Sequence, residues 1–207
     1  MEDVLDLYAR GYDPKRPLIC FDEKMVQLIA ETRRSLPSKP GRPERFDYEY
    51  RRQGTANLFI SFRPFAGWRH VQVTAQRTKV DFAHCLRYLV DELFPEAEVI
   101  IIVVDNLNTH TPAALYEAFK PAEAKRILER LEFHYTPKHG SWLNMVEIEI
   151  GVLTEQCLDR RIPDMDTLRT EVAAWEAARN EQKATVNWRF STTDARIKLK
   201  RLYPDIP

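Results

Sequence analysis

The sequence predicts an α/β protein in which helices pack on both faces of a mixed β-sheet. Two apolar runs of strand length occur at 18–21 and 99–104, and the second is a β-branched stretch typical of a strand covered on both faces. Alternating apolar residues at 58–62 and 71–75, separated by turn residues 64–67, indicate an antiparallel hairpin. Apolar residues at helical spacing fill much of the remaining chain, which adds packed helices to the predicted sheet.

The helices are predicted from apolar residues that recur every three or four positions. Within 79–94 this stripe consists of Phe82, Leu86, Leu89, Val90 and Leu93, and Pro95 ends the helix. Alternation predicts one more strand at 131–135. Further helices are expected within 1–16, at 112–119, 121–130, 143–157 and 165–180, and from Asp194 onward.

The resulting order of elements fits the ribonuclease H-like fold, an α/β fold with three antiparallel strands plus parallel strands and helices on both faces. We expect 1–16 to form an N-terminal helix and a linker from a preceding domain. We expect 17–160 to form the catalytic core and 161–207 a C-terminal helical extension of the same domain.

Composition and charge limit the possible functions. The 207 residues suffice for a domain with a buried core, and 44% hydrophobic residues are usual for a globular protein. The 31 basic and 31 acidic residues balance, so any nucleic-acid-binding surface has to be a local basic patch. The three cysteines are far apart, which indicates reduced thiols in the cytoplasm. We expect no signal peptide and no membrane span.

Two of the predicted strands end in an aspartate, Asp22 in CFDEK and Asp105 in VVDNLNTH. If these strands are parallel neighbours, both side chains point into one crevice at the sheet edge. Two close carboxylates repel each other, and a divalent cation that prefers oxygen ligands, Mg²⁺ or Mn²⁺, removes this conflict. For either aspartate alone, a turn residue or a helix cap is the alternative.

A third carboxylate is available on the helix predicted at 143–157. Glu147 and Glu149 flank its apolar stripe on opposite sides, so only one of them can face a given crevice. The stripe consists of Leu143, Val146, Ile150 and Leu153. Helical periodicity leaves the choice between the two glutamates open.

Four strings in this order resemble the DDE transposases of bacterial insertion sequences, in the branch related to the mariner elements. The strings are CFDEK, VVDNLNTHT, HYTPKHGSWLNMVEIE and NWRFSTTDARIKLKRLYP, and the resemblance covers nearly the whole chain from residue 18. It implies a ribonuclease H-like catalytic domain with Asp22 and Asp105 as the first two acids. The family's third acid follows an Asn by three positions, which selects Glu147 after Asn144 and leaves Glu149 as the fallback.

The resemblance implies that the three acids are catalytic and hold two Mg²⁺ or Mn²⁺ ions. The implied reactions are metal-dependent nicking of DNA at a transposon end and joining of the freed 3′-hydroxyl to target DNA. The implied partners are this DNA and a second copy of the chain, in the bacterial cytoplasm. Asn106, His110 and Asn144 are candidates for hydrogen bonds to the carboxylates, and helix capping is the alternative for His110.

A basic loop at 33–52 is the main candidate for DNA contact, and a plain surface loop is the alternative. Its basic residues are Arg33, Arg34, Lys39, Arg42, Arg45, Arg51 and Arg52. Lys138 and His139 are further candidates for phosphate contacts, and Trp142 for stacking on a base. The alternatives are a solvated charge for Lys138 and core packing for Trp142.

Two other functions are compatible with the sequence. Because no DNA-binding domain is visible before the core, the chain could be a truncated, non-catalytic transposase fragment that acts as a dimerisation or regulatory module. A different metal nuclease of the same fold, acting on RNA hybrids, is the third hypothesis.

Overall fold

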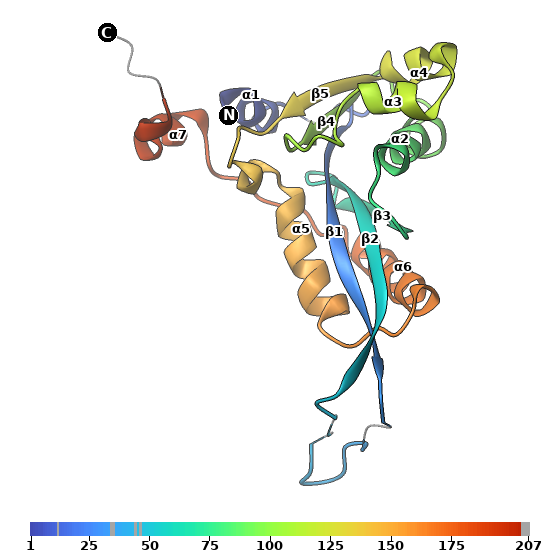
Figure 1. Cartoon of the computed structure of the whole chain (residues 1–207). Helices are drawn as coiled ribbons and strands as arrows, with labels where there is room; N and C mark the ends of the chain where they lie inside the picture. Colours follow the sequence, from blue (N-terminus) through green and yellow to red (C-terminus); the bar gives the residue numbers. More distant parts are fainter. Residues whose placement is uncertain (12, 34–35, 44, 46, 204–207) are drawn as a thin grey trace.

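The computed structural model describes residues 1–11, 13–33, 36–43, 45 and 47–203 (Figure 1). The strands are β1 (Leu18–Glu31), β2 (Tyr50–Arg63), β3 (Trp68–Thr74), β4 (Ile100–Val104) and β5 (Leu131–Tyr135). The α-helices are α1 (Glu2–Tyr8), α2 (Lys79–Tyr88), α3 (Ala113–Ala118), α4 (Pro121–Leu128), α5 (Val146–Leu153), α6 (Met165–Glu181) and α7 (Thr192–Lys198). Each predicted strand and helix is therefore confirmed, with differences at the ends.

Some predicted helices change their winding along their length. Helix α2 continues as a π-helical turn over Leu89–Leu93, and α5 continues as another over Thr154–Leu158. A 3₁₀ turn, Ser141–Leu143, precedes α5, and Lys200–Leu202 forms a similar turn after α7. The helices predicted at 79–94 and 143–157 thus have nearly the expected extent. The first is α-helical only in its first part, and the second only in its middle part.

The five strands form one sheet in the order β3-β2-β1-β4-β5. Strand β2 pairs antiparallel with both β1 and β3, whereas β4 is parallel to β1 and β5 is parallel to β4. The predicted mixture of three antiparallel strands with parallel strands is confirmed. Thr78 begins α2 with a capping box, in which its side chain and that of Asp81 bond reciprocally to each other's backbone N–H groups.

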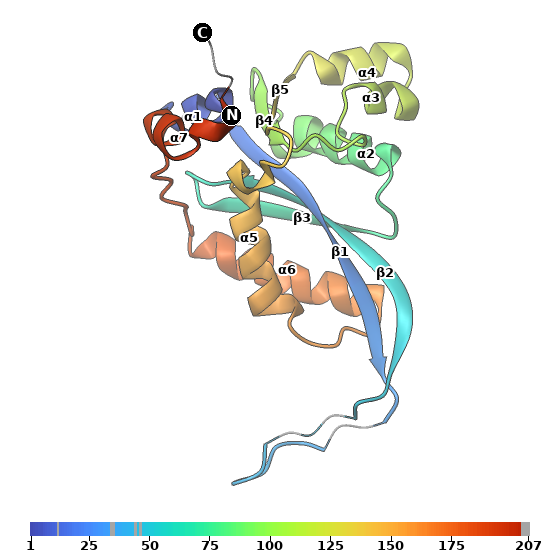
Figure 2. The same ribbon diagram turned by 60° about the vertical axis from the view of Figure 1, so that its left-hand side comes forward.

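Helices cover both faces of the sheet (Figures 1 and 2). One core contains side chains of α1, α5 and α6, and the other contains side chains of α2, α3 and α4. Successive residues of β1 alternate between the two, since Cys20 belongs to the first core, and Ile19 and Phe21 belong to the second. The same alternation directs Asp22 to the α5 face and Glu23 to the α2 face.

Both ends of the chain contribute to the first core. Tyr8 of α1 and Trp175 of α6 are buried in it, and the Tyr8 hydroxyl donates a 2.8 Å hydrogen bond to the Leu143 carbonyl. Helix α7 lies beside α1, and Arg196 forms a 2.8 Å ion pair with Glu2. The domain boundaries predicted at residues 17 and 161 stay predictions.

Strand β1 is longer than predicted, and the prediction that it ends at Asp22 is wrong. It continues to Glu31 because β2 pairs with it along its whole length, from Cys20↔Phe62 to Glu31↔Tyr50. Beyond the end of β4, β1 and β2 continue as a pair that first packs with α5 and α6, with Leu28 and Ala56 buried in the first core. Only the far end of this ribbon projects from the body of the protein (Figures 1 and 2). We call this projecting end, with the loop at its tip, the arm (the described residues of 30–52).

The loop at the tip of the arm is a narrow hairpin. Leu36 and Arg45 exchange backbone hydrogen bonds of 3.0 and 3.1 Å, and Lys39 and Arg42 exchange bonds of 2.9 and 2.8 Å. Gly41, at a φ of +75°, forms the turn between the second pair, a conformation that favours glycine. Arg34, which was predicted to add to the basic loop, lies outside the described residues.

No helix within the described part of the chain is long and apolar enough to cross a membrane. Cys20, Cys85 and Cys157 are buried, and each of them is a free thiol.

Candidate active site

Asp22 lies where β1 separates from β4. The last paired residues of these strands are Cys20 and Val103, and β4 ends one residue later. The Asp22 side chain is therefore beside the carboxyl end of β4, although β1 itself continues. Asp22 is only 7% exposed, and its Oδ1 accepts a 2.7 Å hydrogen bond from the backbone N–H of Glu23.

Asp105 directly follows β4, as predicted, and is partly buried. Its Oδ1 accepts a 3.1 Å hydrogen bond from the backbone N–H of Leu107 and a 2.5 Å hydrogen bond from Nδ1 of His110. No described residue donates a hydrogen bond to Oδ2. One carboxylate oxygen of Asp105 is thus held in place, and the other is available to a ligand.

The pKa values of Asp22 and Asp105 are shifted in opposite directions. Burial raises the pKa of Asp22 to about 7; the Glu23 N–H opposes this rise, and the charges of Asp105, Glu23 and Glu147 add to it. Burial also raises the pKa of Asp105, but the hydrogen bond and charge of His110 outweigh burial and leave this pKa below its usual value. The two aspartates therefore differ because Asp22 is the more deeply buried and Asp105 is paired with His110.

The two glutamates of α5 have different environments. Glu149 is 2% exposed and forms ion pairs of 2.9 Å with Arg69 and 3.1 Å with Arg179. Glu147 is exposed to solvent, and its charge acts on Asp22. Glu149 therefore has a structural role on the side of α5 that faces β3 and α6, and Glu147 is the better candidate for the third acid.

Asn144 ties together the strands that carry the two aspartates. It is fully buried, and its Nδ2 donates to the carbonyl of Phe21 at 2.9 Å and to that of Val103 at 3.5 Å. Its Oδ1 is buried and has no hydrogen-bond partner among the residues that the structure describes. Asn106 lies further out, with its side-chain amide donating to the carbonyl of Thr136.

The arrangement does not form a closed metal cage. Among the residues described, no three His, Cys, Asp or Glu side chains are grouped closely enough to hold a metal ion. The chemistry of the donors nevertheless fits a divalent cation that prefers oxygen, because Asp22 and Asp105 each have a carboxylate oxygen to which no described residue donates. The unpartnered Oδ1 of Asn144 adds a third oxygen in the same region of the described structure.

The predicted DNA-contacting residues lie at two places. Lys138 and His139 are exposed in the connection between β5 and α5, where a hollow of about 540 Å³ is lined by both of them and by Trp142. Trp142 is 47% exposed and packs edge-on against Phe190, so it is neither buried in the core nor free of contacts. The predicted arginines are exposed along the arm: Arg42, Arg45, Arg51 and Arg52.

Glu23 is a site residue that the sequence analysis did not identify. Its side chain is fully buried and contacts Nε2 of His110 at 2.6 Å. The only signal in the sequence is the alternation along β1, which turns Glu23 to the opposite face from Asp22. That alternation does not show that an imidazole lies on this face.

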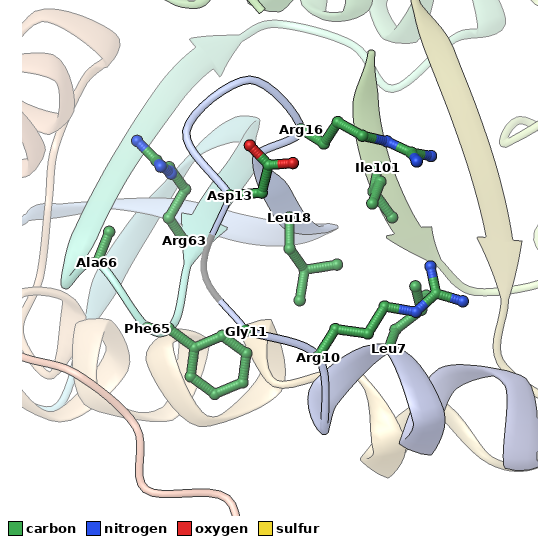
Figure 3. A pocket seen from close by; sticks show the side chains of 10 residues that line it. All are labelled: Leu7, Arg10, Gly11, Asp13, Arg16, Leu18, Arg63, Phe65, Ala66 and Ile101. Atoms are coloured by element: carbon green, nitrogen blue, oxygen red, sulfur yellow. The ribbon is translucent and has the colours of Figure 1, made fainter. Parts of the chain in front are cut away.

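A second, smaller hollow lies away from the carboxylates (Figure 3). It measures about 180 Å³ and opens at the amino ends of β1 and β4, beside Leu18 and Ile101. Arg10, Arg16 and Arg63 surround it. Because Asp22 and Asp105 lie toward the carboxyl end of the β1–β4 pairing, this hollow is not part of the candidate active site.

The family of the chain follows from a comparison with protein families. The DDE superfamily endonuclease family matches residues 17–169, and the chain belongs to this family.

Solved structures of a transposase have the same fold. The chain is similar to the Mos1 mariner paired-end complex with Mn, with a TM-score of 0.58 and 17% identity over 88% of this chain and 54% of that one. It is also similar to the Mos1 strand transfer complex, with a TM-score of 0.57 and 16% identity over 88% of this chain and 53% of that one. The chain thus spans about half the length of these proteins, and the likeness confirms the ribonuclease H-like fold. No curated protein matches the chain.

Proposed function

We propose that this chain is the catalytic domain of a transposase, which cleaves DNA and transfers strands with Asp22, Asp105 and Glu147 as its catalytic, metal-binding carboxylates. The observation that carries the proposal is that Asp22 and Asp105 lie on neighbouring strands at the carboxyl end of the β1–β4 pairing, each with a carboxylate oxygen to which no described residue donates a hydrogen bond. The pKa of Asp22, raised mainly by burial, is raised further by the charges of the other two. Acids that repel one another in this way form a site that a cation stabilises.

The chain's own residues would hold and orient the reacting groups. Asp22 and Asp105 would supply oxygen ligands from two core strands, and Glu147 would supply another from the exposed side of α5. Two bound Mg²⁺ or Mn²⁺ ions would supply activation of the attacking oxygen and stabilisation of the leaving oxygen. Asn144 would keep the two aspartate-bearing strands at a constant separation through its contacts with Phe21 and Val103.

The proposed substrates are transposon-end DNA and target DNA. The arm offers Arg42, Arg45, Arg51 and Arg52 to phosphates, and all four are exposed. Lys138, His139 and Trp142 offer phosphate and base contacts near the amino end of α5. The Mos1 structures are paired-end and strand transfer complexes, which supports DNA as the partner. A homodimer as the working form and a bacterial insertion sequence as the source of the chain are proposed from the resemblance of the sequence motifs alone.

A nicking assay tests this function. The purified chain should convert supercoiled plasmid to the nicked form in the presence of Mn²⁺ or Mg²⁺, and chelation should stop the reaction. Asp105→Asn should be inactive, whereas Glu155→Gln, an exposed glutamate after α5, should retain full activity. Equal nicking by wild type and Asp105→Asn would contradict the assignment and favour a non-catalytic role.

A further inference from the structure

A buried chain of contacts connects Asp105 to Glu23. His110 lies between them, with Nδ1 at 2.5 Å from Oδ1 of Asp105 and Nε2 at 2.6 Å from Oε2 of Glu23. The side chains of His110 and Glu23 are both fully buried. Since both ring nitrogens face carboxylate oxygens, the imidazole donates through both of them.

The surroundings of His110 hold its ring in a single orientation. Phe21 and Phe82 pack against the ring, with centroid distances of 6.0 and 4.9 Å. The outer oxygen of Glu23, Oε1, is buried without a hydrogen bond from any described residue, and Arg77 lies 3.6 Å from it. A buried carboxylate is unfavourable unless it is paired, and the 2.6 Å contact with buried His110 is the shorter of the two ion pairs that stabilise Glu23 here.

The chain of contacts crosses the point where the backbone no longer joins the two strands. Backbone pairing between β1 and β4 ends at Cys20 and Val103. Glu23 is on β1 next to Asp22, and Asp105 follows β4, so the side-chain link through His110 fixes Asp105 relative to the strand that carries Asp22. On the other face of the sheet, Asn144 makes the corresponding link at Phe21 and Val103.

We propose that Glu23 is a positioning residue that, through His110, orients Asp105 so that Oδ1 is occupied and Oδ2 remains available for a divalent cation. This inference rests on the proposed function, because it assigns Asp105 to metal binding. Residues that hydrogen-bond to metal ligands typically change metal affinity or activity by about 10–100-fold when they are removed.

Calorimetric titration of the DNA-free chain with Mn²⁺ provides a readout that does not depend on activity. Glu23→Met, which retains length but removes the acceptor, should weaken Mn²⁺ binding by about 10-fold or more. Glu23→Gln retains an acceptor at the same position and should bind within a few-fold of wild type. The matched control is Glu176→Met, which breaks another carboxylate–imidazole pair, the 3.0 Å contact with His70 on β3, and should leave Mn²⁺ affinity unchanged.

A double-mutant cycle with Asp105→Asn separates positioning from general destabilisation. If Glu23 acts through Asp105, Glu23→Met should add no further loss of affinity in the Asp105→Asn background. An equal additional loss in that background, or unchanged affinity of Glu23→Met, would overturn the inference. If Glu23→Met does not fold, His110→Phe makes the same test, since it fits among the aromatic rings but donates no hydrogen bond, and unchanged affinity would again overturn it.

The two proposals fail in different ways. A wild-type chain that binds no Mn²⁺ and does not nick DNA contradicts the proposed function itself. A wild-type chain that binds Mn²⁺ with an affinity lowered by Asp105→Asn but not by Glu23→Met contradicts only the positioning role.

Discussion

Two regions of this protein contain buried carboxylates, and they differ in whether arginine side chains neutralise the negative charge. Around the proposed site (Asp22, Asp105 and Glu147), burial raises the pKa of Asp22, and the charges of Asp105 and Glu147 add to this rise. In the ion-pair cluster formed by Arg69, Glu149 and Arg179, a single buried glutamate is balanced by two guanidinium groups. Glu147 and Glu149 stand two residues apart on the same helix, yet they belong to different regions.

The difference shows that a carboxylate with a structural role and carboxylates with a proposed catalytic role can lie in separate regions of one fold. Arg69 is completely buried, and it also donates a 2.7 Å hydrogen bond to the carbonyl of Ala184, so the cluster ties β3 and the segment after α6 to α5. The negative charge of Glu149 is already neutralised within the cluster. At the proposed site, no described residue donates a hydrogen bond to one oxygen of Asp22 or of Asp105, and a divalent cation is the group that we propose to bind there.

The largest expected effect is on stability in the ion-pair cluster. Glu149→Gln should lower the free energy of unfolding by about 3–5 kcal/mol, because it leaves the buried Arg69 without its counter-charge. Urea denaturation measures this change. Glu171→Gln, which removes an exposed partner of Arg160, should change stability by less than about 1 kcal/mol and serves as the control. A decrease no larger than that of Glu171→Gln would show that the cluster is not structural.

The next largest effect is expected on catalysis at the proposed site. Glu147→Gln should reduce the rate of DNA nicking by roughly 100-fold or more, about 2.7 kcal/mol, while the urea midpoint stays near that of wild type. Stability is preserved because Glu147 is exposed. Nicking rates of Glu147→Gln and Glu149→Gln, compared at a temperature where both are folded, test whether Glu147 is the catalytic glutamate and Glu149 the structural one. If Glu149→Gln is the inactive one, the third acid has been assigned wrongly.

A smaller effect is the pH dependence of metal binding. The folded-state pKa of Asp22, about 7, lies above its ordinary value, so this group stabilises the metal-free fold at low pH and loses that contribution as pH rises through about 7. A metal must displace the proton, and Mn²⁺ affinity should therefore increase about fivefold, roughly 1 kcal/mol, from pH 6 to pH 7 if one proton is released. Calorimetry at several pH values measures this slope. Asp22→Asn should flatten it, and an equally steep slope in that variant would assign the proton to another group.

The smallest effect is expected on the arm. Arg51→Ala and Arg52→Ala should each weaken binding to duplex DNA modestly and reduce the slope of log Kd against log salt by about 0.9 for each phosphate that is no longer neutralised. Fluorescence anisotropy over a range of salt concentrations measures the slope. Lys125→Ala, on the exposed side of α4, is the control and should leave the slope unchanged. Identical slopes for all three variants would show that Arg51 and Arg52 of the arm do not contact DNA phosphates.

Much of the fold could be predicted because each element has a local pattern. The β-branched run before Asp105 has the composition of a strand covered on both faces, and it forms β4 at the centre of the parallel pairing. The site was predictable only in part. The strand end at Asp105 is visible in the sequence, but Asp22 lies within a strand, because β2 extends β1 beyond the point that its apolar run suggests.

The sequence by itself determined the order of strands and helices along the chain and the place of the two aspartates directly after apolar runs, since apolar periodicity is a local property of the chain. Only the tertiary structure decided which of Glu147 and Glu149 is buried and which is exposed, because a helix has two sides and the sequence does not state what faces each. The arginines that cover Glu149 come from β3 and α6, far away in the chain. The buried position of Glu23 against His110 depends in the same way on contacts between distant segments.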